Sequence, residues 1–201
     1  MAPDFEIPSA NGELTYSYRP SLLGAPWVFT LTEHGLNWAV GSRAGQVRYR
    51  DVRRLRLSFK PASMQTQRFL TEIWAEGAPR LQVISSSWKS MVEQEPQDKR
   101  YAAFVTELHA RIARAASPVP VQYEQGSSPF VYWPGLALYI VMALAMAAMI
   151  LRALEAHTLG AAAFIAAFVA LFLWQGGKFF LRNRPGRYRP DALPPALIPR
   201  R

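Results

Sequence analysis

The chain of 201 residues contains no cysteine. This absence excludes disulfide bonds, thiolate catalysis and cysteine-ligated metals, and it argues against a disulfide-stabilised exported domain. The three histidines, at 34, 109 and 157, share no ligand spacing, whereas a zinc site needs three or four converging donors. The sequence also lacks a glycine-rich phosphate loop and a G-x-S-x-G nucleophile motif. We therefore expect no cofactor, no metal site and no enzymatic activity.

Charge is missing from one long stretch of the chain. Residues 130–151 contain no charged side chain, and these 22 residues would cover about 33 Å as a helix, enough to cross a hydrocarbon core of ~30 Å. A second apolar stretch, residues 159–181, follows a short loop at 152–158. A single segment can satisfy its backbone polar groups in lipid only as a helix. The sequence therefore predicts two transmembrane helices that form a helical hairpin.

The formal net charge of +9 is unevenly distributed. Residues 1–129 carry 15 Lys/Arg against 12 Asp/Glu, but the chain from Lys178 onward carries seven basic residues against Asp191 alone. The basicity therefore belongs to the membrane boundary, and we expect no nucleic-acid partner. Because Lys and Arg are enriched in cytoplasmic segments near spans, we predict a two-span protein of the bacterial inner (plasma) membrane with both termini cytoplasmic. The N-terminus has no basic patch followed by an apolar run, so no cleavable signal peptide is expected.

The residues before the first span show the pattern of a soluble domain. Residues 1–26 are expected to form an irregular arm with a β-like run at 14–18, and strand-like alternation begins at Trp27. One helix is predicted from Asp98 onward, with an apolar stripe at i, i+3, i+4, i+7 and i+11. We expect residues 116–129 to be a linker. Residues 182–201 are expected to be a basic, proline-rich cytoplasmic tail, whose last residues, from Pro190 onward, are either disordered or a docking strand for a partner.

Over residues 27–115, the order of short antiparallel strands followed by one amphipathic helix resembles the pleckstrin-homology-like (PH-like) barrel. The run VRYRDVRRLRLSF at 47–59 is similar to the third strand and short turn of bacterial PH-like domains. Such domains often accompany a helical hairpin in small membrane proteins of the YcxB-like kind, although there the helices commonly precede the domain. The resemblance implies an α+β fold, with a PH-like antiparallel β-barrel or sandwich capped by a C-terminal helix and followed by the transmembrane hairpin. It implies no catalytic residues.

Two groups of basic residues are candidates for binding lipid headgroups. In a continuous strand, residues of equal parity share one face, and arginine binds phosphate bidentately. Such a strand would form either an anionic-lipid surface or a solvated outer face of the barrel. Basic residues beside a span anchor topology and also gain energy near an anionic leaflet. The first group is Arg48, Arg50, Arg54 and Arg56, and the second is Lys178, Arg182, Arg184 and Arg187.

These patterns favour a non-enzymatic inner-membrane protein that presents a PH-like domain at the cytoplasmic membrane face as an interaction or scaffold module. Its expected partners are the lipids of the anionic leaflet and a membrane protein or a second copy of the chain. The alternative is a subunit of a small oligomeric channel or transporter formed by packed hairpins. The uncharged, alanine-rich spans argue against this alternative, because ion-coupled transport usually needs ionisable residues within the bilayer.

Overall fold

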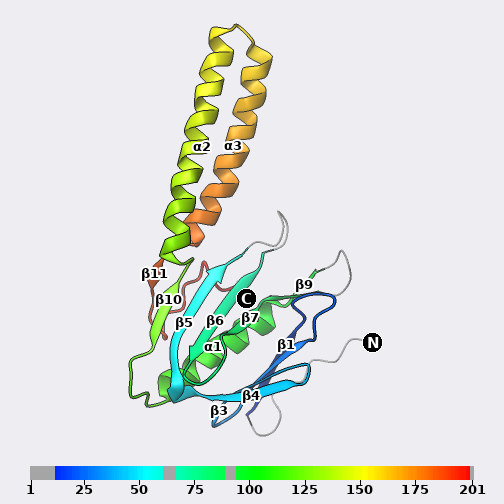
Figure 1. Ribbon diagram of the computed structural model, residues 1–201, viewed down its shortest axis with the longest axis vertical. Helices are drawn as coiled ribbons and strands as arrows, with labels where there is room; N and C mark the ends of the chain where they lie inside the picture. The colour runs from blue at the N-terminus through cyan, green and yellow to red at the C-terminus, as the bar shows by residue number, and fades with distance from the viewer. Residues whose placement is uncertain (1–11, 61–66, 89–93, 200–201) are drawn as a thin grey trace. The chain divides into compact units, whose positions relative to one another are not determined.

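The computed structural model describes residues 12–60, 67–88 and 94–199 of a chain that divides into two compact units. The first unit combines residues 1–125 with residues 186–201, and the second comprises residues 126–185. The first unit is α+β, which confirms the predicted class (Figure 1).

The first sheet has the order β1-β2-β3-β4, and all its neighbouring strands are antiparallel. Alternation builds it, because Phe29 and Leu31 point inward and are fully buried while Thr30 between them is not. Gly35 is required at the turn into β3, since a Cβ there would lie 2.4 Å from the carbonyl oxygen of Val47. The strand bounds are β1 Leu14–Tyr18, β2 Trp27–Leu31, β3 Gly35–Val40 and β4 Arg43–Arg48.

The second sheet has the order β11-β10-β5-β6-β7 and includes two strands that the sequence analysis did not predict. Strand β10 lies within the expected linker and pairs in parallel with β5, and β11 lies within the expected tail and pairs with β10. Parts of the expected linker and of the expected tail are therefore strands of the second sheet. The bounds are β5 Val52–Phe59, β6 Phe69–Ala75, β7 Leu81–Ile84, β10 Gln122–Gln125 and β11 Gly186–Arg187. A short third sheet pairs β8 Ser86–Trp88 with β9 Gln94–Pro96.

Helix α1, Asp98–Arg114, closes the core between the first two sheets. Its predicted apolar stripe is buried throughout. Phe104 contacts the rings of Tyr16 and Phe29 from the first sheet, and Tyr101 contacts Phe69 and bonds Thr71 of the second. A helix that contacts both sheets in this way positions each relative to the other.

The sheets of the described residues do not close into a barrel through backbone pairing, contrary to the closed form of the predicted fold. Side chains span the gap instead. The hydroxyl of Tyr16 donates to the carbonyl of Ile84 at 2.6 Å, and the hydroxyl of Tyr18 donates to the carbonyl of Gln82. These bonds satisfy carbonyls on the outer edge of β7, an edge that would otherwise be open to pairing with another strand.

The second unit is the helical hairpin of α2, Pro129–Glu155, and α3, Leu159–Arg182. Both helices are long and apolar enough to cross a membrane, as predicted, and they are almost entirely exposed. They approach closely where Gly176 faces Tyr139, whose ring stacks on Phe172 with centroids 4.8 Å apart. At the open end of the hairpin, the amide of Ser127 donates to the carbonyl of Asn183 at 2.9 Å.

Candidate functional site

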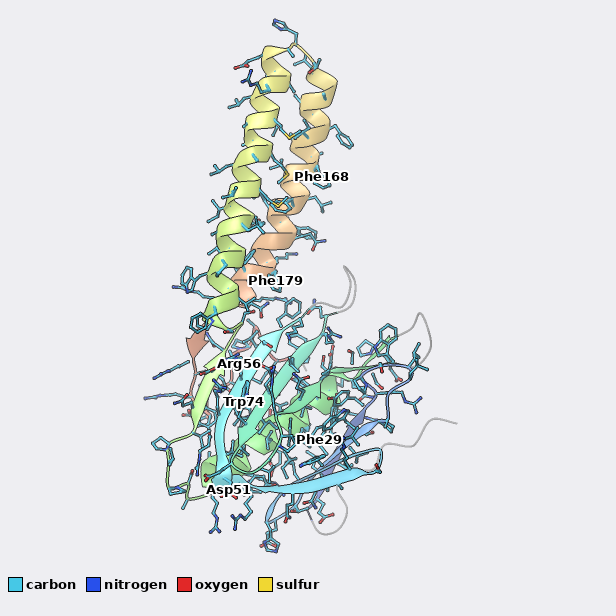
Figure 2. The ribbon with its side chains drawn as sticks, viewed as in Figure 1. Phe29, Asp51, Arg56, Trp74, Phe168 and Phe179 are labelled. Carbon is cyan, nitrogen blue, oxygen red and sulfur yellow. The ribbon has the colours of Figure 1, made fainter. Side chains whose placement is uncertain are left out.

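The four arginines of the first predicted group do not lie on one continuous strand. A 3₁₀ turn at Tyr49–Asp51 separates β4 from β5, because the side chain of Tyr49 is buried there and donates to the carbonyl of Thr32 at 2.7 Å. Arg48 ends β4 and Arg50 lies in the turn, whereas Arg54 and Arg56 lie on β5. Figure 2 shows Asp51 at the start of β5 and Arg56 farther along the strand. The prediction of a single four-arginine face was therefore wrong.

Arg48 and Arg50 both face Asp51. The Nε of Arg48 lies 2.7 Å from one carboxylate oxygen, and the Nε of Arg50 lies 4.0 Å from the other. Both arginine side chains are more than half exposed. Exposed pairs of this kind contribute at most about 1 kcal/mol. These two residues therefore resemble the solvated surface that the sequence analysis kept as its alternative.

Arg54 and Arg56 belong to a denser arrangement on the outer face of the second sheet. In the register of β5 with β6, Arg54 is opposite Trp74 and Arg56 is opposite Glu72. The guanidinium carbon of Arg54 lies 4.0 Å from the centre of the Trp74 ring, and those of Arg56 and Arg80 lie 5.3 and 5.2 Å away. Figure 2 shows Trp74 and Arg56 on neighbouring strands. Guanidinium groups at such distances are attracted to the indole ring.

Two carboxylates neutralise part of this positive charge. Glu124 of β10 accepts from the Nε and Nη2 of Arg56 at 2.9 and 2.5 Å, and it lies 3.9 Å from Arg54. Glu72 is almost fully buried, accepts from Arg80 and lies 4.0 Å from Arg56. Three guanidinium groups thus meet two carboxylates around one indole. We define this arrangement as the arginine–tryptophan face, composed of Arg54, Arg56, Glu72, Trp74, Arg80 and Glu124.

A further cation lies near this face. Lys60 has the same parity as Arg56 and immediately follows β5. Burial lowers the pKa of the Lys60 ammonium, and repulsion from Arg80 and Arg68 lowers that pKa further. This region therefore carries more positive charge than its own carboxylates neutralise.

The arginine–tryptophan face has the chemistry of a binding surface. Partly exposed guanidinium groups beside an aromatic plane bind phosphates, carboxylates and flat rings. The described residues contain no group of three or more His, Cys, Asp or Glu side chains that could hold a metal ion. The arrangement also brings no nucleophile next to a base.

The second predicted group is divided between the two units. Lys178 and Arg182 lie on α3, where the ammonium of Lys178 sits 3.6 Å from the centre of the Trp174 ring one turn earlier. Arg184 is exposed just after α3, and Arg187 is exposed on β11 of the first unit. Lys178, Arg182 and Arg184 thus remain candidates for anchoring the hairpin, while Arg187 is part of the folded domain.

Sequence reasoning missed the residues that hold the tail to the domain. His109 of α1 is buried, its Nδ1–H donates to the carbonyl of Val105 at 2.7 Å, and its Nε2 accepts from the hydroxyl of Tyr188 at 2.7 Å. The rings of Tyr123 and Tyr188 both lie against the imidazole. Burial lowers the pKa of His109 to about 4. The only sequence signal for this cluster is tyrosine within each of two short segments on either side of the helical hairpin.

Comparisons with protein-family models, with curated proteins and with solved structures gave no match to this chain.

Proposed function

We propose that this protein is a non-enzymatic membrane-anchored interaction module, in which the helical hairpin holds a PH-like domain at the cytoplasmic face of the bacterial inner membrane. The main observation behind this proposal is that the hairpin interrupts the sequence of the folded domain. An exposed apolar hairpin is inserted between two adjacent strands of a folded domain, since Gln125 and Gly186 are register partners on β10 and β11.

The exposed apolar surface of the hairpin supports the membrane assignment. Leucine, phenylalanine and methionine side chains along both helices are about half exposed or more, which in water would be a large unfavourable patch. Trp133 and Trp174 lie near the open end of the hairpin, where aromatic residues favour the membrane interface. Lys178, Arg182 and Arg184 follow at the same end, whereas the turn between the helices adjoins only Arg152 and Glu155. This charge bias supports cytoplasmic termini.

The order of the elements supports a PH-like fold. Four antiparallel strands, β1 to β4, are followed by three more, β5 to β7, by the short pair β8 and β9, and then by a helix that packs between the two sheets. The open edge between β1 and β7, the parallel strand β10 and the returning strand β11 are additions to that plan in this chain.

The arginine–tryptophan face supplies the binding surface of the proposed module. Arg54, Trp74 and Arg80 are partly exposed, so their polar and aromatic groups remain available to a partner. The excess positive charge favours an acidic partner segment or anionic headgroups. A protein that binds to this face would make the membrane-anchored domain a scaffold.

The test is affinity purification of the full chain from native membranes in mild detergent. A double variant, Arg54→Gln with Trp74→Ala, removes two partly exposed groups of the face and keeps the partly buried Arg56–Glu124 pair. The matched control, Arg43→Gln with Trp27→Ala, makes the same chemical changes on the first sheet. We expect a protein that co-purifies with the wild type and with the control to be lost from the Arg54/Trp74 variant. Identical protein sets from all three chains would contradict the proposal, and homo-oligomers that conduct ions in planar bilayers would favour the channel alternative.

A further inference from the structure

The point where the domain is joined to the hairpin identifies one end of the second sheet. Gln125 is the last residue of the domain before the hairpin, and Gly186 is the first residue after it. Only residues 126–128 precede α2 and only residues 183–185 follow α3. Three residues reach at most about 10 Å. Both chain connections therefore leave the sheet at one end, and both are short.

The register shows which residues share that end. Strand β10 runs parallel to β5, with Gln125 opposite Leu57, so the sheet end at Gln125 is also the end at which β5 finishes. Phe59 and Lys60 follow, and the amide of Lys60 donates to the carbonyl of Arg68 at 2.8 Å. Lys60 and Arg68 thus lie beside each other at the end of the sheet from which the chain departs for the hairpin.

Arg50 lies at the opposite end of β5. Arg50 lies in the 3₁₀ turn before Val52, the first residue of β5, and Leu57 is five residues farther along the strand, which corresponds to about 17 Å at 3.3 Å per residue. The prediction that Arg48 and Arg50 face the leaflet would therefore require the domain to turn its far end toward the membrane, against two short connections.

The charge at the near end is positive and lacks a carboxylate partner in the part of the chain that the structure describes. Neither Lys60 nor Arg68 forms an ion pair with a described residue, and Lys60 as a whole residue is exposed. Partial burial of the Lys60 side chain lowers the pKa of its ammonium, and repulsion from Arg80 and Arg68 lowers that pKa further.

We propose that the end of the second sheet carrying Lys60 and Arg68 faces the anionic leaflet and binds the phosphates of its phospholipid headgroups. The proposal rests on the proposed function, because it requires the hairpin to cross the membrane. The occupant is lipid rather than a protein segment, since the two short connections place this end within reach of the headgroups and the exposed charge is complementary to theirs. Each such cation should raise the equilibrium constant for contact between this sheet end and the leaflet about fivefold, which corresponds to about 1 kcal/mol near an anionic surface.

The absence of cysteine allows a direct test in the full chain, because one introduced cysteine takes one fluorescent label. We would label Gln67→Cys, which adjoins Arg68, and as the matched control Val119→Cys, which is exposed and precedes β10 at the opposite sheet end. Each chain is reconstituted in phosphatidylcholine vesicles with or without phosphatidylglycerol. A nitroxide on the lipid headgroup then quenches any label that lies close to it. A third label, at His157→Cys, reports whether the turn between the helices reaches the other side of the membrane.

We expect the Gln67 label to be quenched more strongly than the Val119 label, and phosphatidylglycerol to increase that difference. In phosphatidylglycerol vesicles, replacing Lys60 and Arg68 by glutamine should lower the ratio of quenched to unquenched label about 25-fold, the product of two fivefold effects. The charge-matched variant Arg48→Gln with Arg50→Gln should leave it unchanged. Equal quenching at both sheet ends, or no response to the Lys60/Arg68 variant, would overturn the inference while leaving the membrane anchor intact. A His157 label that fails to cross would overturn both the inference and the proposed function.

Discussion

Acidification should destabilise the domain through His109, the buried imidazole of α1. Its Nδ1–H donates to Val105 and its Nε2 accepts from Tyr188, so the folded state holds the neutral ring with both nitrogens bonded. Burial lowers its pKa to about 4 from the ordinary value of 6.5. Between these two pH values the unfolded chain binds a proton that the folded chain excludes. The stability contributed by the neutral ring is therefore complete above pH 6.5 and is lost as the pH falls to 4.

The size of this loss follows from the two pKa values. Each tenfold difference in proton affinity corresponds to about 1.4 kcal/mol, so the full difference corresponds to about 3 kcal/mol. Most of it, about 2 kcal/mol, is expected between pH 7 and pH 5. For a small domain whose total stability is about 5–15 kcal/mol, this is a large fraction.

The measurement is guanidinium unfolding of the full chain in nonionic detergent, followed by tryptophan fluorescence, for the wild type and for His109→Gln. Acidic groups also titrate in this range, so the informative quantity is the difference in unfolding free energy between the two proteins at each pH. That difference should change by about 3 kcal/mol in favour of the variant from pH 7 to pH 4. A difference that is independent of pH would refute the assignment of a buried, neutral His109.

Three further predictions concern packing and connectivity. Joining Gln125 to Gly186 through an Asn-Gly turn should give a soluble, folded domain. The backbone amide of Tyr188 donates to the carbonyl of Tyr123, and a two-residue turn closes hydrogen-bonded pairs of that register. Residues 1–125 alone should be less stable, and equal melting temperatures of the two proteins by circular dichroism would contradict this. Gly45→Val should destabilise the domain by about 1–3 kcal/mol, because a Cβ there would lie 2.8 Å from the Trp38 ring, and chemical denaturation measures the change. Gly176→Leu should separate the two helices, because a Cβ there would lie 2.2 Å from the Tyr139 ring. Cysteines placed on facing positions of α2 and α3 should then cross-link more slowly than in the parent chain. An unchanged cross-linking rate would count against this packing.

Local patterns were sufficient where an element is stabilised by its own periodicity. The stripe from Tyr101 to Ile112 identified α1 and its buried face, and the absence of charge identified the two long helices.

The sequence could not reveal features that depend on distant pairing. Strand β10 has four residues and β11 has two, too few for a periodic signal, and β10 pairs with Arg54, 68 residues away from its first residue Gln122. The sequence also could not reveal that Arg56 forms an ion pair, because its partner Glu124 lies on β10. The 3₁₀ turn that divides the arginines depends on burial of the Tyr49 ring, which a parity argument does not take into account.

The return of the chain from the hairpin to the domain also sets an order of synthesis. When residue 125 has been made, the domain still lacks β11, Tyr188 and the buried Leu197. The ribosome must add a further 72 residues to reach Leu197, which takes about 4–14 s at 5–20 residues per second. In the proposed membrane protein, the hairpin meets the insertion machinery during that interval, while His109 has no tyrosine hydroxyl to accept from and β10 has an open edge. In the proposed membrane protein, completion of the domain is thus a late event that follows delivery of the hairpin to the membrane, and a chain arrested before Gly186 leaves the edge of β10 unpaired.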